Sequence, residues 1–498
     1  MAATYDTVVI GGGTAGAAAA GRLAARGDGS VLLLEAGPDY GARDAGGWPA
    51  DLLDARILTT SHDWGFASAA RTGIPDHALP RARVIGGCSS HNGCIALWGH
   101  RLDYDGWSAM GNLGWSAEEM LPFFRRANEM LRVRNFSEQE VTPFHAGCLE
   151  AMAMAGIPAT EGLNDVNESI GSAVAPVNIQ DGVRWNTAMA YLDPVREAPQ
   201  LTVMGDALVD RIHLEANRAV SVEIVHGGTT QRINTGRIIL SAGAYGSPAI
   251  LMRSGIGEAG ALENLGIQVT INLAGVGKNL HDHPAIELQY RGSETLSSRM
   301  AAFAAAGHPI FTEQSLAKAR SGHCEEAFDI HVYPASSSRP DDEGRWTLTF
   351  PVANMAPRSR GHVWLRSVDA AANPAIDTAY LTDRDEVDVA VLMDGIALAR
   401  RITSSNALAC LLEQELPESE VVIDRATARS ACVHYYHPVG TCKMGPASDT
   451  TAVVDASGTV HGCENLTVAD ASVMPTIPRA NTNLPTLALA EKIVAGLG

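Results

Sequence analysis

The sequence predicts an α/β protein, and three features near the amino terminus carry this prediction. Residues 7–10 form a short β-branched apolar run, and residues 17–25 form an alanine-rich stretch typical of a helix. Residues 31–34 form a second apolar run. Strands this apolar are buried on both faces, as in a parallel sheet covered by helices. The order strand, turn, helix, strand is that of a βαβ unit of the Rossmann-like type.

The turn between the first strand and the helix reads GGGTAG over residues 11–16. Gly11 permits a tight turn, Gly13 lets the backbone approach a pyrophosphate, and Gly16 lets the helix pack closely on the strand. The start of the helix then offers N–H groups and a positive dipole end to phosphates. Glu35, about 20 residues further on, can accept hydrogen bonds from a ribose diol. The sequence therefore predicts a dinucleotide site, and the motif alone does not separate NAD from FAD.

The composition indicates a globular protein of about two domains. The chain has 498 residues, which exceeds one ordinary domain. Apolar residues make up 46% and charged residues 19%, as in folded proteins. The net charge of -19 argues against nucleic-acid binding, which depends on basic side chains that contact phosphates. No apolar run reaches the roughly 18 residues needed to span a bilayer, so no membrane span is predicted.

The eight cysteines are scattered, and none forms a Cys-x-x-Cys pair. No metal site is therefore predicted. The first strand begins within about five residues of the amino terminus, which leaves no room for a targeting segment. A cytoplasmic protein with reduced thiols is expected.

The rest of the chain contains recognisable loops, strands and helices. Residues 38–80 are rich in Gly, Pro and Asp and are predicted as long loops that cover another part of the protein. Residues 220–225 alternate and lead into His226-Gly227-Gly228, which predicts a hairpin. Residues 387–402 have helical periodicity, and residues 485–497 are predicted as a last helix with proline in its first turn.

Residues 83–95, which read RVIGGCSSHNGCI, resemble a segment of the glucose–methanol–choline (GMC) oxidoreductases. Residues 241–257, 275–284, 437–445 and 468–475 resemble four further family segments in the family's own order. The first segment is most similar to that of choline oxidase-like bacterial alcohol oxidases. The resemblance spans nearly the whole chain. It implies the GMC fold, FAD as the cofactor, and a second, α+β substrate domain built on an antiparallel sheet.

The resemblance also implies a catalytic pair. Oxidation of an alcohol needs a base for the hydroxyl proton, and histidine suits this role because its pKa lies near neutrality. A second donor stabilises the developing alkoxide. By resemblance the base is His437 and its partner is Asn481. Asn483 is an alternative to Asn481 that spacing alone leaves open.

Four other histidines are candidates for a structural or a functional role. His434 is expected to be structural or to line the pocket. His281 and His283 are expected to be structural, because two histidines one residue apart are not by themselves a metal site. His331 either reaches the substrate or is structural.

In choline oxidase the histidine of the Cys-Ser-Ser-His-Asn stretch carries a covalent bond to the flavin. His91 occupies that position, so we expect it to be attached to FAD, the alternative being that it packs beside the isoalloxazine ring. Gly93 stands where choline oxidase has serine. The missing hydroxyl argues against assuming choline specificity or the same reaction rate.

The predicted FAD contacts come from the glycine turn, the 83–95 segment and the motifs near the carboxy terminus. By resemblance, Asp470 is expected to hydrogen-bond the ribityl or pyrophosphate region, and Val209 to offer its backbone to adenine. The helix start at Asn483 would face the pyrimidine end of the flavin, where N–H groups stabilise negative charge. The full set is Gly11, Gly13, Thr14, Ala15, Gly16, Glu35, Arg83, Gly87, Ser90, His91, Asn92, Gly93, Cys94, Ile95, Val209, Asp470, Ala471 and Asn483.

The motif positions predict a discontinuous FAD-binding domain at residues 1–150, 186–283 and 436–498. The substrate domain is then expected at residues 151–185 and 284–435. Strands near Tyr333 and at residues 346–350 are expected to line its pocket.

The predicted activity is FAD-dependent oxidation of a small-molecule alcohol to an aldehyde or ketone. His437 would take the proton, flavin N5 would take the hydride, and oxygen would accept the electrons. The alternatives are a dehydrogenase that uses a quinone or another electron carrier and, with less support, a non-redox hydroxynitrile lyase of the same fold. The sequence leaves the identity of the alcohol and the oligomeric state open.

Overall fold

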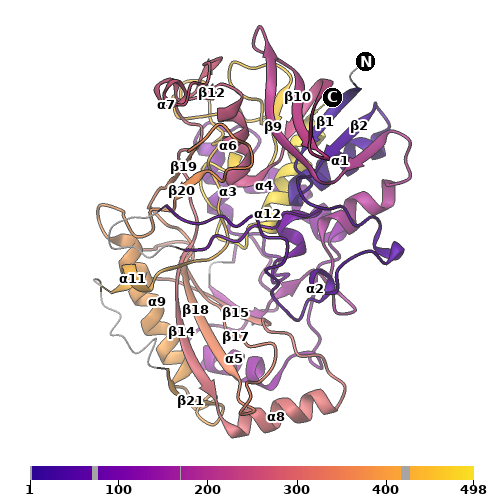
Figure 1. Ribbon diagram of the computed structural model, residues 1–498. Coiled ribbons are helices and arrows are strands. Elements are labelled where there is room, and N and C mark those ends of the chain that lie inside the picture. Colours follow the sequence, from indigo (N-terminus) through magenta and orange to yellow (C-terminus); the bar gives the residue numbers. More distant parts are fainter. Residues whose placement is uncertain (1–2, 70–76, 169, 417–424, 426, 498) are drawn as a thin grey trace.

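The computed structural model describes residues 3–69, 77–168, 170–416, 425 and 427–497. Two β-sheets organise the chain, one in the upper half of the view and one in the lower half (Figure 1). Both ends of the described chain lie at the upper end (Figure 1). None of the described helices is both long and apolar enough to cross a membrane.

The first sheet has the strand order β8-β2-β1-β11-β10-β9, with β23 also paired to β11. Strands β1, β2, β8 and β23 run parallel to their neighbours, whereas β9 and β10 are antiparallel. Its strands are β1 (Thr4–Ile10), β2 (Val31–Leu34), β8 (Leu201–Met204), β9 (Ala207–Glu215), β10 (Arg218–His226), β11 (Thr229–Leu240) and β23 (Leu466–Val468). The predicted βαβ unit is confirmed, with helix α1 (Thr14–Arg26) between β1 and β2. The predicted hairpin joins β10 to β11.

Helix packing on this sheet depends on small side chains. Helix α1 contacts both β1 and helix α12 (Asn483–Gly496). The run from Ala17 to Ala20 is buried, and a Cβ at Gly21 would lie 2.4 Å from the carbonyl oxygen of Tyr191. Alanine and glycine thus let α1 approach its neighbours closely, as dense interiors require. Further helices of this half are α3 (Arg101–Ala109), α4 (Ala117–Met130), α6 (Gly243–Arg253) and α7 (Ala259–Asn264).

The second sheet is antiparallel, with the order β21-β14-β18-β16-β15-β4, and this confirms the expected sheet of the second unit. Two short strands, β17 (Ala335–Ser336) and β22 (Val433–His434), pair with β18 and β14. The main strands are β4 (Gly171–Val174), β14 (Pro284–Gly292), β15 (Ser315–Ala319), β16 (Ile330–Val332), β18 (Thr347–Asn354) and β21 (Leu412–Glu415).

Helices cover one face of this sheet, and strand β18 shows how its two faces differ. Leu348, Phe350 and Val352 are fully buried in a core shared with helices α5 (Pro143–Met154), α8 (Glu294–Ala305) and α9 (Val387–Thr403). The intervening residues Thr347, Thr349 and Pro351 line a cavity. Because side chains alternate along a strand, one strand serves both the core and the site.

The division of the chain into two domains stays a proposal. Helix α5 crosses the proposed boundary at residue 150 and packs against the second core.

Candidate active site

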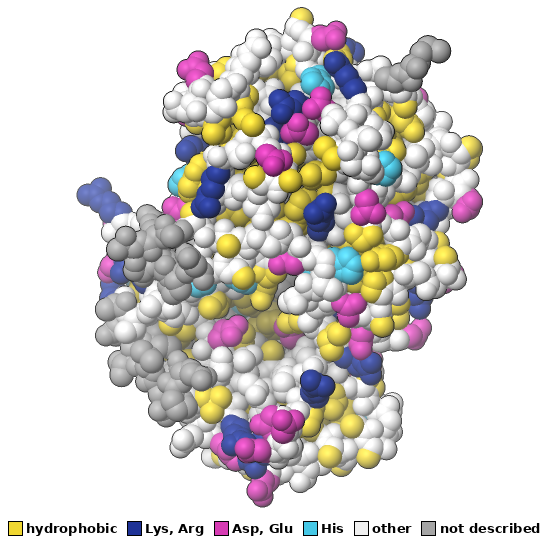
Figure 2. Space-filling view, in the orientation of Figure 1, with side chains coloured by type: hydrophobic (Ala, Val, Ile, Leu, Met, Phe, Trp, Pro, Cys, Tyr) yellow, Lys and Arg dark blue, Asp and Glu magenta, His cyan; other side chains and the backbone are white. Residues whose placement is uncertain are grey.

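A cavity of about 830 Å³ extends from the carboxyl ends of β1 and β2 to the open face of the second sheet. Its wall includes the glycine turn, residues 91–93, the start of α12 and strand β18. Seen from outside, the molecule is hollowed between its upper and lower halves (Figure 2). Ligands of open α/β sheets bind at the carboxyl ends of the strands, so this end of the cavity is the expected dinucleotide site.

The glycine turn has the backbone that the sequence predicts. Gly11 has a φ of 93°, and a Cβ there would lie 2.5 Å from the carbonyl oxygen of Ser241. A Cβ at Gly16 would overlap the carbonyl oxygen of Gly11, so this glycine serves helix–strand packing, as predicted. Gly13 and Gly87 face each other at the wall, and a Cβ at Gly87 would lie 2.6 Å from the Cα of Gly13. The two glycines leave a cradle that side chains would fill.

Glu35 lies at the end of β2, and its carboxylate holds the turn. Its Oε2 accepts a hydrogen bond from the N–H of Gly12 at 2.8 Å, and its Oε1 accepts one from Gly37 at 2.8 Å. Burial raises the pKa of Glu35, whereas these two backbone donors lower it. Each oxygen keeps further acceptor capacity toward the cavity that Glu35 lines.

Two helix starts converge at the cavity. The hydroxyl of Thr14, the first residue of α1, donates to Oδ1 of Asn483, the first residue of α12, at 3.0 Å. The Nδ2 of Asn483 is buried and has no partner among the described residues. The positive ends of two helix dipoles and a free amide donor therefore face the same space, which favours an anionic ligand.

Asp470 joins two turns beside this cradle. Its Oδ2 accepts hydrogen bonds from the N–H of Gly243 at 2.9 Å and from the Ser247 hydroxyl at 2.6 Å. Its Oδ1 accepts from the N–H of Ser472 at 2.7 Å. The carboxylate thereby holds the two turns together. Asp470 and the next residue, Ala471, both line the cavity.

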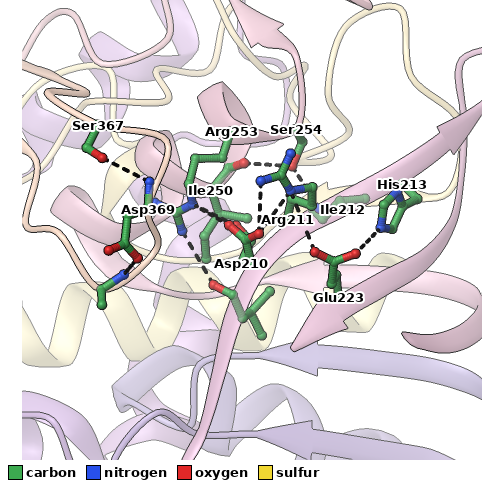
Figure 3. A network of polar contacts seen from close by, with 12 residues as sticks. Asp210, Arg211, Ile212, His213, Glu223, Ile250, Arg253, Ser254, Ser367 and Asp369 are labelled. Atoms are coloured by element: carbon green, nitrogen blue, oxygen red, sulfur yellow. Dashed lines mark hydrogen bonds and ion pairs between the residues drawn. The ribbon is translucent and has the colours of Figure 1, made fainter. Parts of the chain in front are cut away.

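The far end of the cavity is lined by Val209 on β9 and by Arg253 at the end of α6. The guanidinium of Arg253 donates to the Asp210 carbonyl at 2.7 Å and pairs with its carboxylate at 3.2 Å, as Figure 3 shows. This contact locks α6 to β9. The sequence carried no signal for Arg253, because its partner becomes a neighbour only in the folded chain.

Residues 86–95 run beside the glycine turn, and the N–H of Gly86 donates to the Gly12 carbonyl at 2.7 Å. Arg184 is fully buried and donates to the carbonyls of Asn92 at 2.8 Å and Ser90 at 3.2 Å. Its other hydrogen bonds reach backbone carbonyls in the segment 51–57. One buried cation therefore fixes the segment that carries His91. The sequence analysis missed Arg184.

The predicted FAD contacts fall into two groups. Gly11, Gly13, Thr14, Ala15, Glu35, Gly87, His91, Asn92, Gly93, Ile95, Val209, Asp470, Ala471 and Asn483 line the cavity. Gly16, Arg83, Ser90 and Cys94 lie outside its described wall. The Ser90 hydroxyl donates to the Ile85 carbonyl at 3.0 Å, and Arg83 donates to the Ala36 carbonyl at 3.0 Å. These side chains support the wall in the structure.

The predicted catalytic pair comes together at the other end of the cavity. Nδ2 of Asn481 lies 3.3 Å from Nε2 of His437, and both residues line the cavity. Asn483, the alternative to Asn481, is instead bonded to Thr14. His434 also lines the cavity, in agreement with one of its two expected roles.

His283 was expected to be structural, but it directly contacts His437. The two Nδ1 atoms lie 2.9 Å apart. With Nδ2 of Asn481 as a donor, Nε2 of His437 is the acceptor, and the ring proton lies on Nδ1 and points to His283. The contact between His283 and His437 thus sets the tautomer that leaves Nε2 able to take a proton.

Electrostatics keep this pair neutral. Burial, with smaller electrostatic contributions from the neighbouring His283 and Arg81, holds the pKa of His437 well below its usual range. Burial lowers the pKa of His283 to about 3. Asp282 fixes the backbone, because its carboxylate accepts from the N–H of His437 at 2.8 Å and from the Tyr380 hydroxyl at 2.8 Å.

His331 does not line the cavity in the described wall. It is fully buried and stacks on Phe328 with a centroid distance of 5.4 Å. Tyr333, two residues on, does line the cavity, together with Glu287, Glu313 and Tyr435.

The fold and the site are those of a dinucleotide-binding protein with a buried histidine at the wall of its cavity. The chain belongs to the GMC oxidoreductases, whose family models match residues 5–285 and 357–490. Members of this family use FAD, and the glycine cradle, the two helix starts and the free amide of Asn483 fit that group. The protein is therefore an FAD-dependent oxidoreductase that acts on alcohols.

Individual relatives cover nearly the whole chain. Human mitochondrial choline dehydrogenase is 35% identical over 98% of this chain and 89% of its own length. Choline oxidase of Arthrobacter globiformis is 33% identical over 98% of this chain and 93% of its own. The crystal structure of pyridoxine 4-oxidase from Mesorbium loti has a TM-score of 0.86 and 29% identity, with 99% of both chains covered.

Proposed function

We propose that this protein oxidises a small-molecule alcohol to an aldehyde or ketone, with His437 as the base. The observation that carries the proposal is the neutral His437–Asn481 pair at the wall of a cavity that also contains the dinucleotide cradle. Both parts are needed for hydride removal from an alcohol, and they line one cavity.

The chain's own residues perform the proton chemistry. Nε2 of His437 takes the hydroxyl proton of the alcohol, while its Nδ1–H stays bonded to His283. The Nδ2 group of Asn481 can donate to the developing alkoxide, as an oxyanion contact does. Bound FAD supplies the oxidant that accepts the hydride from the hydroxyl-bearing carbon.

The proposed cofactor contacts are the cavity-lining residues of the cradle. Gly11, Gly13 and Thr14 would hold the pyrophosphate, and Glu35 the ribose. Asn483 at the start of α12 would face the ring that becomes negatively charged on reduction.

We also propose a covalent bond between His91 and FAD. His91 lines the cavity, and its Nε2 is buried without a hydrogen-bond partner in the part of the chain that the structure describes. Burial lowers the pKa of His91 to about 4, so the ring is neutral and its nitrogen is available. A bond from this nitrogen to a flavin carbon would replace one N–H and one C–H bond, release two protons, and leave two electrons for the acceptor that also reoxidises the flavin. Acid precipitation should leave the yellow colour in the pellet of wild type and in the supernatant of His91→Ala. Colour in the wild-type supernatant would refute the bond.

We propose oxygen as the electron acceptor. Relatives named as choline oxidase and as oxygen-dependent choline dehydrogenase support this choice. The human relative is named a choline dehydrogenase, and this supports the alternative of another electron carrier. After anaerobic reduction, rapid return of the yellow colour in air supports oxygen, and faster return with an artificial acceptor supports the alternative.

The test of the base is His437→Ala. We expect FAD to stay bound, because the predicted cradle lies elsewhere on the wall, while alcohol oxidation falls by roughly 10²–10⁴-fold. Flavin absorbance and kcat/KM measure the two quantities. Turnover close to that of wild type with bound FAD would rule out the proposed role.

A further inference from the structure

Gly93 makes room for a carboxylate that comes from the other half of the molecule. A Cβ at Gly93 would overlap Oε2 of Glu313, and the next atom, Cδ of Glu313, would lie at 3.2 Å. Gly93 is not among the residues with a left-handed φ. The structure therefore uses the missing side chain of this glycine and not its backbone freedom.

Glu313 is held in this position from the second sheet. The hydroxyl of Tyr333 donates to Oε2 of Glu313 at 2.7 Å, which is the oxygen that faces Gly93. Both residues line the cavity that contains His437. The ring of Tyr333 also contacts that of Tyr435 at a centroid distance of 6.5 Å, and Tyr435 contacts His437, so Tyr333 and Glu313 belong to the His437 end of the cavity.

Two further polar groups line the same space. Glu287 lines the cavity, and its charge acts on Glu313. Tyr435 is 8% exposed, and its hydroxyl has no hydrogen-bond partner among the described residues. Its ring packs on that of His437 at a centroid distance of 4.9 Å, so Tyr435 lies beside the proposed base.

Among the described residues, no cation forms an ion pair with either carboxylate. Arg184 is the nearby cation that acts on Glu313, but its hydrogen bonds go to backbone carbonyls. A ligand that satisfies two carboxylates must bring positive charge and N–H donors. A protonated amine has both, whereas a quaternary ammonium has the charge without donors and a neutral alkyl group has neither.

We propose that Glu313, admitted by Gly93 and held by Tyr333, is a specificity-determining residue that binds a protonated amino group of the substrate. The inference rests on the proposed function, because it assigns the second functional group of the alcohol that His437 deprotonates. It makes this cavity selective for amino alcohols.

The test compares three alcohols of similar length with the holoenzyme: 3-aminopropan-1-ol, its N,N,N-trimethyl derivative and butan-1-ol. We expect kcat/KM for the primary amine to exceed that for butan-1-ol by at least about tenfold, since a charge-assisted hydrogen bond is strong. Glu313→Gln should abolish this preference. Glu118→Gln removes a charge on the exposed first turn of α4 and is the matched control, in which the preference stays.

Gly93→Ala provides an independent test that keeps the carboxylate. The new methyl group must displace the flexible end of Glu313, so the amine preference of the FAD-loaded enzyme should fall. Gly106→Ala, where nothing lies within 4 Å of the added Cβ, is the control for a glycine change. In a Glu313→Ala background, Gly93→Ala should have little further effect, because residues in contact are not additive.

Binding of propylammonium, which has no hydroxyl, separates this inference from the proposed function. Calorimetry should detect binding to wild-type holoenzyme that Glu313→Gln weakens at least about tenfold. If no alcohol bleaches the flavin and this binding remains, the proposed function fails and the subsite stands. An amine preference or propylammonium affinity that is unchanged in Glu313→Gln overturns the inference, as does equal preference for the quaternary derivative.

Discussion

Replacement of His283 tests how the proposed base is held. Among the described residues, the two ring nitrogens of His437 contact His283 at 2.9 Å and Asn481 at 3.3 Å. His283→Ala leaves the buried Nδ1 of His437 without its partner, which costs about 1–3 kcal/mol. If this cost appears in the transition state, kcat/KM falls by about 5- to 150-fold, since about 1.4 kcal/mol is a factor of ten.

A second variant separates positioning from packing. His283→Asn keeps an acceptor near the position of Nδ1 and should retain most of the activity that His283→Ala loses. His461→Ala, which removes a histidine bonded to the Gly445 carbonyl away from the cavity, should leave kcat/KM unchanged. Anaerobic flavin reduction and steady-state kinetics provide the rates, and flavin absorbance checks FAD content.

The pH profile gives a readout that a purely structural role would not move. The base works when neutral, so activity is lost as pH falls through its pKa. Burial first, and then His283, hold that pKa well below the usual value in wild type, so kcat/KM should stay level to well below pH 6.5. In His283→Ala the pKa should rise and the loss should begin at higher pH. Rates within twofold of wild type and an unshifted profile would refute the reasoning.

Three further predictions concern the cofactor site, the substrate site and stability. Gly87→Ala combines a φ of 53° with a Cβ 2.6 Å from Gly13 Cα, so it should purify with little FAD, measured as the ratio of flavin to protein absorbance. Burial raises the pKa of Glu313 to about 7, and the charge of Glu287 also raises it. The hydrogen bond from Tyr333 and the charge of Arg184 lower this pKa, but their effect is smaller. The preference for an amine over its neutral isostere should therefore fall as pH drops below about 7, and a flat preference from pH 6 to 8 would contradict this. Glu491 is buried and pairs with Arg22 at 2.7 Å, so Glu491→Ala should lower the free energy of unfolding. The loss should be below the roughly 3–5 kcal/mol expected for a fully buried pair, because the Arg22 side chain is 30% exposed. The control is Glu464→Ala at the exposed pair with Arg218, which should cost under about 1 kcal/mol. Urea unfolding measures both values.

Local chemistry explains why much of the fold was predictable. The run of β-branched and apolar residues up to Ile10, the glycines and the alanines of α1 each favour one local structure, and together they define the βαβ unit. The hairpin at His226 was predictable because alternation and a glycine pair coincide. Family resemblance supplied the motifs near the carboxy terminus, which no periodicity would have assigned.

The missed residues are those whose partners lie far away in sequence. Arg184 is bonded to the 90–92 segment, and Glu313 meets Gly93, across stretches that no local pattern connects. His283 was expected to be structural because two histidines one residue apart are not by themselves a metal site, and its contact with His437 joins residues 154 positions apart. These contacts form only in the folded chain, where segments from both sheets line the same cavity.

The most direct test of the central claim is anaerobic reduction of the flavin by an alcohol that carries deuterium on the hydroxyl-bearing carbon. With a substrate that bleaches the flavin, removal of hydride from that carbon predicts slower bleaching by the deuterated form, and very slow bleaching by either form in His437→Ala. Equal bleaching rates for the two forms, or consumption of the alcohol while the flavin stays yellow without air, would contradict the account.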